Sequence, residues 1–410
     1  MNDMMLQATR LTQAGRLSDA TALIQRMLRG GTGPDMTMGQ IKNVTSHGSA
    51  PSAACGVADI DEEADNRHLN MPTFARSFAH FRGFNARDDL PYRVKTPGFR
   101  GWIQRAPVAI ADIVPEGGRF IEAVYTNPAG SRAYKIYIPS RYDGQALPLV
   151  VMLHGGTQTP DDFAAGTRMN LIAEEQTCLV VYPTQPSHAN LAKCWNWFRT
   201  SDQQRDRGEP SLIAGITRQV MERYTVDAQR VYVGGLSAGA AAAAVMGATY
   251  PDLYAAIGVH SGLACGAADD LISAFAAMRQ GASASHATVD ALDNKEPFVP
   301  TIVFHGDRDY IVHPRNADHV IACSQRASNW QRKEHRGRVP DGLAYTRTIH
   351  TDANGRAMLE QWCIHGAGHA WSGGNPAGSY TEPRGPDAAR EMIRFFSEHA
   401  AVGRHTREGK

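Results

Sequence analysis

The sequence predicts an α/β protein in which helices cover both faces of a mostly parallel central sheet. Two observations carry this prediction. From about residue 118 onward, strand-like apolar runs alternate with segments whose apolar residues recur at helical spacing. Several of these runs are continuously apolar, which is typical of parallel strands buried on both faces. A short helical segment and an irregular linker are expected to precede this domain.

The chain divides into four predicted parts. Residues 1–30 carry apolar side chains at helical spacing, interrupted at Gly15, and predict two short helices. These helices could pack on the main domain, pair with another subunit or contact an apolar surface. Residues 31–114 are rich in glycine, serine, proline and charge, and predict a partly disordered linker. The main domain is expected over residues 115–402, followed by a tail at 403–410.

The elements of the main domain are expected in a regular order. A hairpin comes first, with strands in residues 119–127 and 132–140 on either side of a turn rich in proline and glycine. Further strands are expected in residues 147–156, 178–184, 230–235, 254–262, 298–306 and 357–366. Helices are expected in residues 163–177, in 212–224, from Ala238 onward, and in 387–400.

Composition and charge exclude some classes of function. The chain has 42% hydrophobic and 20% charged residues, as an ordinary globular protein does. Its 42 basic and 41 acidic side chains leave a formal charge of +1, which gives no electrostatic argument for binding nucleic acid. No segment has the apolar length of a membrane span. Charges such as Arg10 and Arg16 interrupt the N-terminal apolar residues, so we recognise no secretory signal and expect a cytoplasmic protein.

Six scattered cysteines lack the C-x-x-C spacing of a zinc site, so a structural metal is not expected. Free thiols and one or more disulfides are both compatible with this pattern. The cysteines are Cys55, Cys178, Cys194, Cys265, Cys323 and Cys363.

The segment VYVGGLSAGAAAA, residues 231–243, places Ser237 where a strand-like run changes into a helix-like one. Gly235, Ser237 and Gly239 fit the G-x-S-x-G pattern of a nucleophilic serine on a sharp turn. The turn requires residues with almost no side chain two positions before and after the serine. The following helix directs its positive end at charge that develops on the serine. An ordinary tight turn is the alternative.

A serine hydroxyl is a weak nucleophile unless a base takes its proton. Catalytic groups gather at the carboxyl ends of parallel strands, and two later strands end in polar residues. After the first, we favour Asp309 over Asp307 as the acid, because Asp307 directly follows a glycine and can bind its own turn. After the second, we favour His369 over His365 as the base, because His365 is closer to the strand end. This histidine pair would suit a metal only on a helix, which the nearby glycines oppose.

The oxyanion that forms when a serine attacks an ester carbonyl needs backbone N–H donors already in place. Ala238, directly after the serine, is expected to supply one donor. The second is expected from the glycine-bearing loop after residues 147–153, from Gly156 or Thr157. His154, at the start of this loop, could brace it or contact the substrate.

Aromatic side chains near these loops are candidates for substrate binding. Trp195 and Trp197 belong to the segment CWNWF and lie two residues apart, so in an extended chain one would face the core and the other the cleft. Trp371 follows the candidate base closely. We predict these three tryptophans and His154 as substrate-binding residues, with packing in the core as the alternative for the pair in CWNWF.

On five motifs, the chain resembles the poly(3-hydroxybutyrate) depolymerase-type esterase family, which is similar to the feruloyl and acetylxylan esterases of the α/β-hydrolase superfamily. In order, the motifs are LHGGTQ (153–158), CWNWF (194–198), GLSAGA (235–240), HGDRDYIV (305–312) and HGAGHAWSGG (365–374). The resemblance covers roughly residues 115–400. It implies an α/β-hydrolase fold with Ser237 as nucleophile, Asp309 as acid and His369 as base. Many relatives carry a cysteine where this chain has Gly156, so a disulfide at that position is absent here.

We therefore expect a serine esterase that hydrolyses hydroxyalkanoate or related short-chain esters through an acyl-enzyme on Ser237. Its expected partner is a small ester or a polyester, with no cofactor and no metal. The resemblance also implies an extracellular location as the alternative to the cytoplasm. A feruloyl or acetylxylan-type carbohydrate esterase and a serine peptidase are the alternative enzymes. A protein that binds apolar polymer granules is the alternative from another class.

Overall fold

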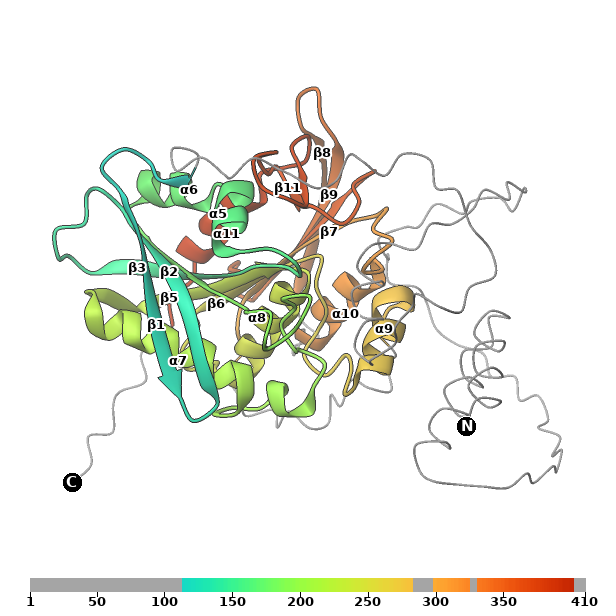
Figure 1. Cartoon of the computed structure of the whole chain (residues 1–410). Helices are drawn as coiled ribbons and strands as arrows, with labels where there is room; N and C mark the ends of the chain where they lie inside the picture. The colour runs from blue at the N-terminus through green and yellow to red at the C-terminus, as the bar shows by residue number, and fades with distance from the viewer. Residues whose placement is uncertain (1–112, 283–297, 325–329, 402–410) are drawn as a thin grey trace, which may run out of the picture. The chain divides into compact units, whose positions relative to one another are not determined.

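The structure, a computed structural model, describes residues 113–282, 298–324 and 330–401 (Figure 1). The predicted helical segment 1–30, the predicted linker as far as residue 112 and the predicted tail 403–410 lie outside the described residues. Within the described part of the chain, no helix has the length and apolar character needed to cross a membrane.

Ten strands of the described chain form one sheet in the order β1-β2-β4-β3-β5-β6-β7-β10-β9-β8. Strands β4, β3, β5, β6, β7 and β10 run parallel in the centre, and antiparallel strands extend both edges. This arrangement confirms the predicted mostly parallel sheet. The strands are β1 (Arg119–Asn127), β2 (Gly130–Ile138), β3 (Leu147–Leu153), β4 (Leu179–Pro183), β5 (Val226–Leu236), β6 (Ala256–His260), β7 (Thr301–Gly306), β8 (Gln331–Arg338), β9 (Ala344–Thr351) and β10 (Ala357–Ile364), with a separate short pair, β11 (Trp371–Ser372) and β12 (Thr381–Glu382).

Helices cover both faces of this sheet, as predicted (Figure 1). They are α5 (Pro160–Thr167), α6 (Met169–Gln176), α7 (Gly208–Arg223), α8 (Ala238–Thr249), α9 (Leu271–Gln280), α10 (Arg315–Ser324) and α11 (Ala388–Ser397), with a short 3-10 helix at Thr200–Gln203. Side chains of β3 alternate between two buried clusters. Leu149, Val151 and Leu153 pack with α7 and α8, whereas Val150 and Met152 pack with α5, α6 and α11. The continuous apolar run of β3 therefore contributes side chains to two buried clusters, one on each face of the sheet.

The predicted helix over residues 163–177 is instead two helices, α5 and α6, which meet at Arg168. Arg168 has φ 53°, and its N–H ends α5 by donating to the Ala164 carbonyl at 3.0 Å. Its Nη2 atom also donates to the Asp387 carboxylate at 3.2 Å and to the Gly373 carbonyl at 3.3 Å. Because these partners are more than 200 residues away, apolar periodicity could not reveal the break.

Apart from the short pair β11–β12 and the 3-10 helix, four elements were not predicted from the sequence: β8, β9, α9 and α10. The sequence of β8, QRKEHRGR, is charged and almost entirely exposed, so it lacks the apolar pattern of a half-buried strand. It nevertheless pairs along its whole length with β9. Charged side chains on an edge strand are a common protection against pairing with other chains.

The parallel centre of the sheet positions the candidate catalytic residues. Strands β5, β6, β7 and β10 are parallel neighbours, so their carboxyl ends lie along one edge. Ser237 directly follows β5, Asp309 lies in the loop after β7, and His369 lies in the loop after β10. Residues far apart in the sequence are thereby brought to the same edge.

Candidate active site

Ser237 occupies the corner between β5 and α8. Its backbone has φ 57° and ψ −120°, which non-glycine residues rarely adopt. A Cβ atom added to Gly239 would lie 2.0 Å from the Leu153 carbonyl oxygen, and one added to Gly235 would lie 2.5 Å from the same oxygen. Both glycines are therefore required for β3 to approach the corner. The Ser237 N–H donates to the His260 carbonyl at 2.9 Å, which ties the corner to β6.

His369 and Asp309 are hydrogen-bonded to each other. His369 Nδ1 lies 2.7 Å from Asp309 Oδ2, and the side chain of Asp309 is fully buried. The other carboxylate oxygen, Oδ1, accepts the N–H groups of Ile311 and Val312, each at 2.9 Å. Because Nδ1 donates to the carboxylate, the His369 Nε2 atom is the one that can accept a proton.

The electrostatics keep Asp309 charged. Burial alone would raise the pKa of its carboxyl group, but the charge of His369 and hydrogen bonds from His305 and His369 outweigh burial. The pKa of Asp309 therefore lies well below its usual value. His305 contributes through Nε2, which lies 3.3 Å from Asp309 Oδ2 and 2.8 Å from the Val312 carbonyl oxygen. A carbonyl only accepts, so Nε2 carries the hydrogen, and sequence reasoning had not identified this second histidine.

A second histidine–aspartate pair lies beside the first. His365 Nδ1 is 2.9 Å from Asp307 Oδ2, and Asp307 Oδ1 accepts the Gly366 N–H at 2.7 Å. The other ring nitrogen of His365, Nε2, is 2.9 Å from the Thr346 hydroxyl. Both His365 nitrogens are therefore engaged, and Asp307 binds its neighbouring loop. This geometry supports the preference for Asp309 and His369.

Asp307, His365 and Cys363 also lie close enough together to form a three-residue metal cluster. Cys363 is disulfide-bonded, however, so its sulfur is not a thiolate ligand. The histidine nitrogens and the carboxylate have the protein partners described above. These residues therefore do not fit a metal ion. Cys178, Cys194, Cys265 and Cys323 are free thiols.

The candidate oxyanion donors differ in whether their backbone N–H already has a hydrogen-bond partner. The Thr157 N–H donates to the Ala192 carbonyl at 2.6 Å, so the prediction that Thr157 could bind the oxyanion is wrong. No hydrogen bond of the Gly156 N–H is found among the described residues, which leaves it as the donor from this loop. Ala238 is the first residue of α8, where the N–H has no partner within the helix. Gly156 and Ala238 are the donors that the geometry supports.

Of the four predicted substrate-binding residues, only Trp197 lines a cavity that reaches Ser237. Trp195 is fully buried, and its indole Nε1 donates to the His154 carbonyl at 3.1 Å. His154 is also buried, with Nδ1 2.8 Å from the Gly155 carbonyl oxygen and Nε2 accepting a backbone N–H. Trp195 and His154 thus brace the loop from inside. The alternatives of packing and bracing replace the substrate-binding roles predicted for them.

Trp371 is also buried rather than exposed to substrate. Its ring stacks on that of His260 with centroids 4.9 Å apart and meets Phe163 edge-on at 5.5 Å. His260 in turn accepts the Ser372 N–H on Nε2 at 3.0 Å. Through its backbone and ring, His260 therefore connects the Ser237 corner to the loop that carries His369. Burial, and then the charges of His305 and His369, hold the pKa of His260 well below its usual value.

Glu209, in the first turn of α7, is a buried anchor that sequence reasoning missed. Its carboxylate accepts the Asn196 N–H at 2.7 Å and the Asn196 side-chain amide at 2.6 Å. It also accepts a hydrogen bond from Gln185, and Arg132 lies 3.5 Å away. Burial, and then the charge of Asp202, raise the pKa of Glu209. This network holds the CWNWF segment against the body of the domain.

We predict that Glu209→Ala will lower the free energy of unfolding by about 3 kcal/mol, because buried amides lose a charged acceptor. Urea unfolding followed by circular dichroism measures the change. Glu222→Ala is the matched control, since Glu222 is exposed on the same helix and should change stability by less than about 0.5 kcal/mol. Equal losses in the two variants would contradict the anchoring role.

The lowered pKa of the buried His154 leads us to predict that the stability of the protein depends on pH. Burial lowers its pKa to about 4, from 6.5. Between pH 6.5 and 4, His154 is protonated in the unfolded chain but not in the folded protein. The free energy of unfolding therefore falls as the pH drops below about 6.5. The full shift corresponds to about 3 kcal/mol, reached below pH 4. We expect His154→Gln to flatten the change in urea-unfolding free energy between pH 7.5 and 5, and the exposed His188→Gln to leave it unchanged. Parallel profiles for both variants would refute this prediction.

Comparison with known proteins agrees with the fold and the motifs. Residues 132–332 match the family described as Esterase PHB depolymerase. Poly(3-hydroxyalkanoate) depolymerase C of Paucimonas lemoignei is 33% identical over 251 residues, which are 60% of this chain and 59% of the depolymerase. The chain thus matches less than two thirds of that relative's length. Feruloyl esterase B of Neurospora crassa is 27% identical over 258 residues, which are 60% of this chain and 85% of the esterase.

Among solved structures, an acetyl xylan esterase from Aspergillus awamori superposes with a TM-score of 0.52 at 21% identity, covering 68% of this chain and 99% of that one. This likeness supports the α/β-hydrolase fold. The names of the relatives support the predicted class of enzyme, a carboxylic ester hydrolase. Motifs, fold and matches agree, and over residues 132–332 the chain is similar to the Esterase PHB depolymerase family.

Proposed function

We propose that this protein is a serine carboxylesterase whose nucleophile is Ser237. The observation that carries the proposal is the arrangement at one edge of the sheet. The serine stands on a strained corner, and the Asp309–His369 hydrogen bond of 2.7 Å lies in the loops of parallel strands on the same side. The N–H groups of Ala238 and Gly156 supply donors for an oxyanion.

In the proposed reaction, His369 Nε2 takes the proton of the Ser237 hydroxyl while the serine oxygen attacks the ester carbonyl. The carbonyl oxygen becomes an oxyanion that accepts hydrogen bonds from Ala238 and Gly156. The protonated His369 then donates to the leaving alcohol, and the carbon–oxygen bond to the alcohol breaks. A water molecule, deprotonated by the same histidine, releases the acid and restores the serine. Asp309 orients the imidazole and stabilises its charged form throughout.

For the natural substrate, we infer a hydroxyalkanoate oligomer or polyester, or a related short-chain ester. The 33% identity to a poly(3-hydroxyalkanoate) depolymerase supports this choice over an aromatic or acetylated carbohydrate ester. The alternative, a carbohydrate esterase, draws support from the 27% identity to feruloyl esterase B over most of that enzyme's length.

A substrate panel on the purified full chain tests the proposal. Hydroxybutyrate oligomers, methyl ferulate, acetylated xylan and an aminoacyl amide are compared by kcat/KM. We expect the oligomers to be turned over fastest. Faster turnover of ferulate or acetylated xylan would favour the carbohydrate esterase, and turnover of the amide alone would overturn the assignment as an esterase.

A further inference from the structure

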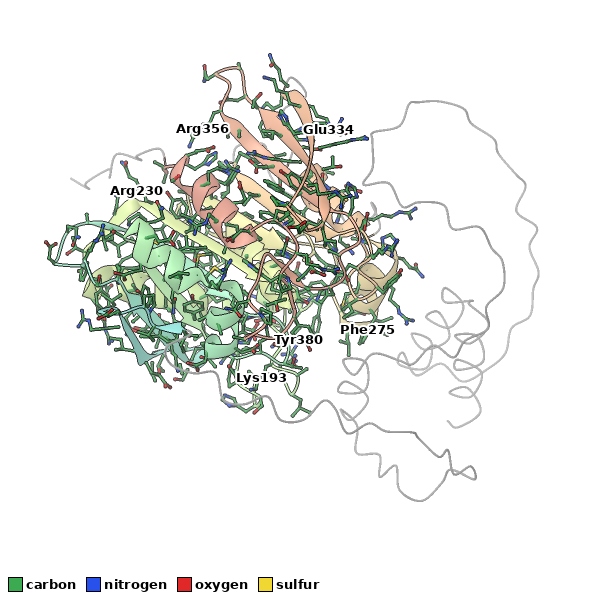
Figure 2. All side chains as sticks on the ribbon, turned by 90° about the horizontal axis from the view of Figure 1, so that it is seen from above. Lys193, Arg230, Phe275, Glu334, Arg356 and Tyr380 are labelled. Carbon is green, nitrogen blue, oxygen red and sulfur yellow. The ribbon has the colours of Figure 1, made fainter. Side chains whose placement is uncertain are left out.

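A cavity of about 390 Å³, counted to its open mouth, lies beside the candidate nucleophile. Ser237 and Ala238 line it at the catalytic corner. Helix α9 contributes four of its lining side chains, Leu271, Ala274, Phe275 and Met278, and Trp197 contributes another. Figure 2 labels Phe275 on this helix. The spacing of these four residues places them on one side of α9, so a single helix forms a large part of the cavity surface.

The lining favours an uncharged, apolar group. Apart from Ser237, every lining side chain is apolar, aromatic or a buried thiol, and none of them carries a charge. A carboxylate or ammonium group placed here would lose its water without gaining a partner.

The position of the cavity indicates which half of the ester it receives. The leaving alcohol must lie near His369, because this histidine gives it a proton. Neither His369 nor any other residue of the loop after β10 lines the cavity. The acyl group, by contrast, stays attached to Ser237, which does line it. The acyl half of the substrate therefore points into the cavity, and the alcohol half lies on the opposite side of the serine.

We propose that α9 forms an acyl-binding pocket, which selects esters of uncharged aliphatic acids. This inference rests on the proposed esterase activity and specifies the acid part of its substrate. Ala274 lines the pocket between Leu271 and Met278 on the same side of the helix, and its small side chain is only 2% exposed. It is therefore the position at which a larger side chain would most directly fill the pocket.

The test is an acyl-length series of p-nitrophenyl acetate, butanoate and hexanoate, with the charged glutarate monoester as a further substrate. In the unmodified protein, kcat/KM should rise roughly three- to fourfold for each methylene group buried. Ala274→Phe should lower kcat/KM for butanoate and hexanoate by about tenfold or more, and change that for acetate by less than about threefold. Met278→Ala should shift the preference toward hexanoate, and it serves as the second variant in case Ala274→Phe folds poorly.

Ala276→Phe is the matched control, since Ala276 is exposed on the same helix and does not line the cavity. Thermal unfolding by circular dichroism monitors folding of all variants. Acetate esters of ethanol, butanol and hexanol, which vary only the alcohol, should respond equally in every variant. A change confined to this alcohol series would overturn the acyl assignment, as would identical acyl profiles for Ala274→Phe and Ala276→Phe. A profile that falls from acetate onward, or rapid turnover of the glutarate ester, would also overturn it.

Failure of the pocket and failure of the proposed function give different results. If the protein hydrolyses none of these esters, the esterase assignment itself fails. If it hydrolyses all of them at similar rates, and Ser237→Ala removes that activity, the esterase stands and the selective pocket is refuted.

Discussion

Replacing Ser237 with alanine is expected to lower kcat for ester hydrolysis by roughly 10⁶-fold. The proton acceptor on His369 then has no hydroxyl to activate, and only the oxyanion donors and substrate binding remain to accelerate attack by water. Hydrolysis of p-nitrophenyl butanoate by the purified protein measures the loss. Within the described residues the Ser237 hydroxyl has no hydrogen bond to lose, so the free energy of unfolding should change by less than about 1 kcal/mol.

Ser211→Ala is the matched control for this variant. Ser211 lies on α7, where its hydroxyl donates to the Gly208 carbonyl at 2.8 Å, and it does not line the cavity at Ser237. It should retain nearly full activity. If Ser237→Ala also retained substantial activity while remaining folded, another residue would have to be the nucleophile and the proposed mechanism would be wrong.

The catalytic corner could be predicted from the sequence because its requirements are local. Gly235 and Gly239 indicate that β3 approaches closely, and the change from a strand pattern to a helix pattern indicates the corner at Ser237. Short-range geometry of this kind leaves a signature in the order of residues. The choice of Asp309 over Asp307 agrees with the geometry, but the local reason for it does not: Asp307 bonds to His365 and to the Gly366 N–H of the loop after β10, not to its own turn.

Features that depend on distant partners could not be predicted in this way. Thr157 looked equivalent to Gly156 until its N–H was found bonded to the Ala192 carbonyl, 35 residues later. Trp371 is aromatic and follows the candidate base, but its stacking on His260 buries it. Helix α9 has no motif, and its role emerges only because its apolar side lies next to the serine. In each case a tertiary contact, rather than residue type, decides the role.

Asp309→Asn should lower kcat by roughly 10⁴-fold without unfolding the protein. The carboxylate at this position accepts a hydrogen bond from His369 Nδ1 at 2.7 Å, which leaves Nε2 free to accept the serine proton. An amide can instead donate to Nδ1 and favour the tautomer with the hydrogen on Nε2, which cannot act as the base. The amide also lacks the negative charge that stabilises the protonated imidazole. Raising the pH should not restore activity, because the defect is in tautomer and charge.

Asp307→Asn is the control that makes this result specific, since it changes the same chemical group two residues earlier. Asp307 bonds to His365 and to the Gly366 N–H, but both nitrogens of His365 already have protein partners, so this pair has no free nitrogen to offer a serine. The variant should keep kcat within about threefold of the unmodified protein and lose about 1 kcal/mol of stability from the weakened loop contact. If Asp307→Asn were the more damaging of the two, the neighbouring pair would have to be the catalytic one. Asp309 is more deeply buried than Asp307, and only its partner His369 keeps a ring nitrogen available to accept the serine proton. These two differences assign the catalytic role to Asp309.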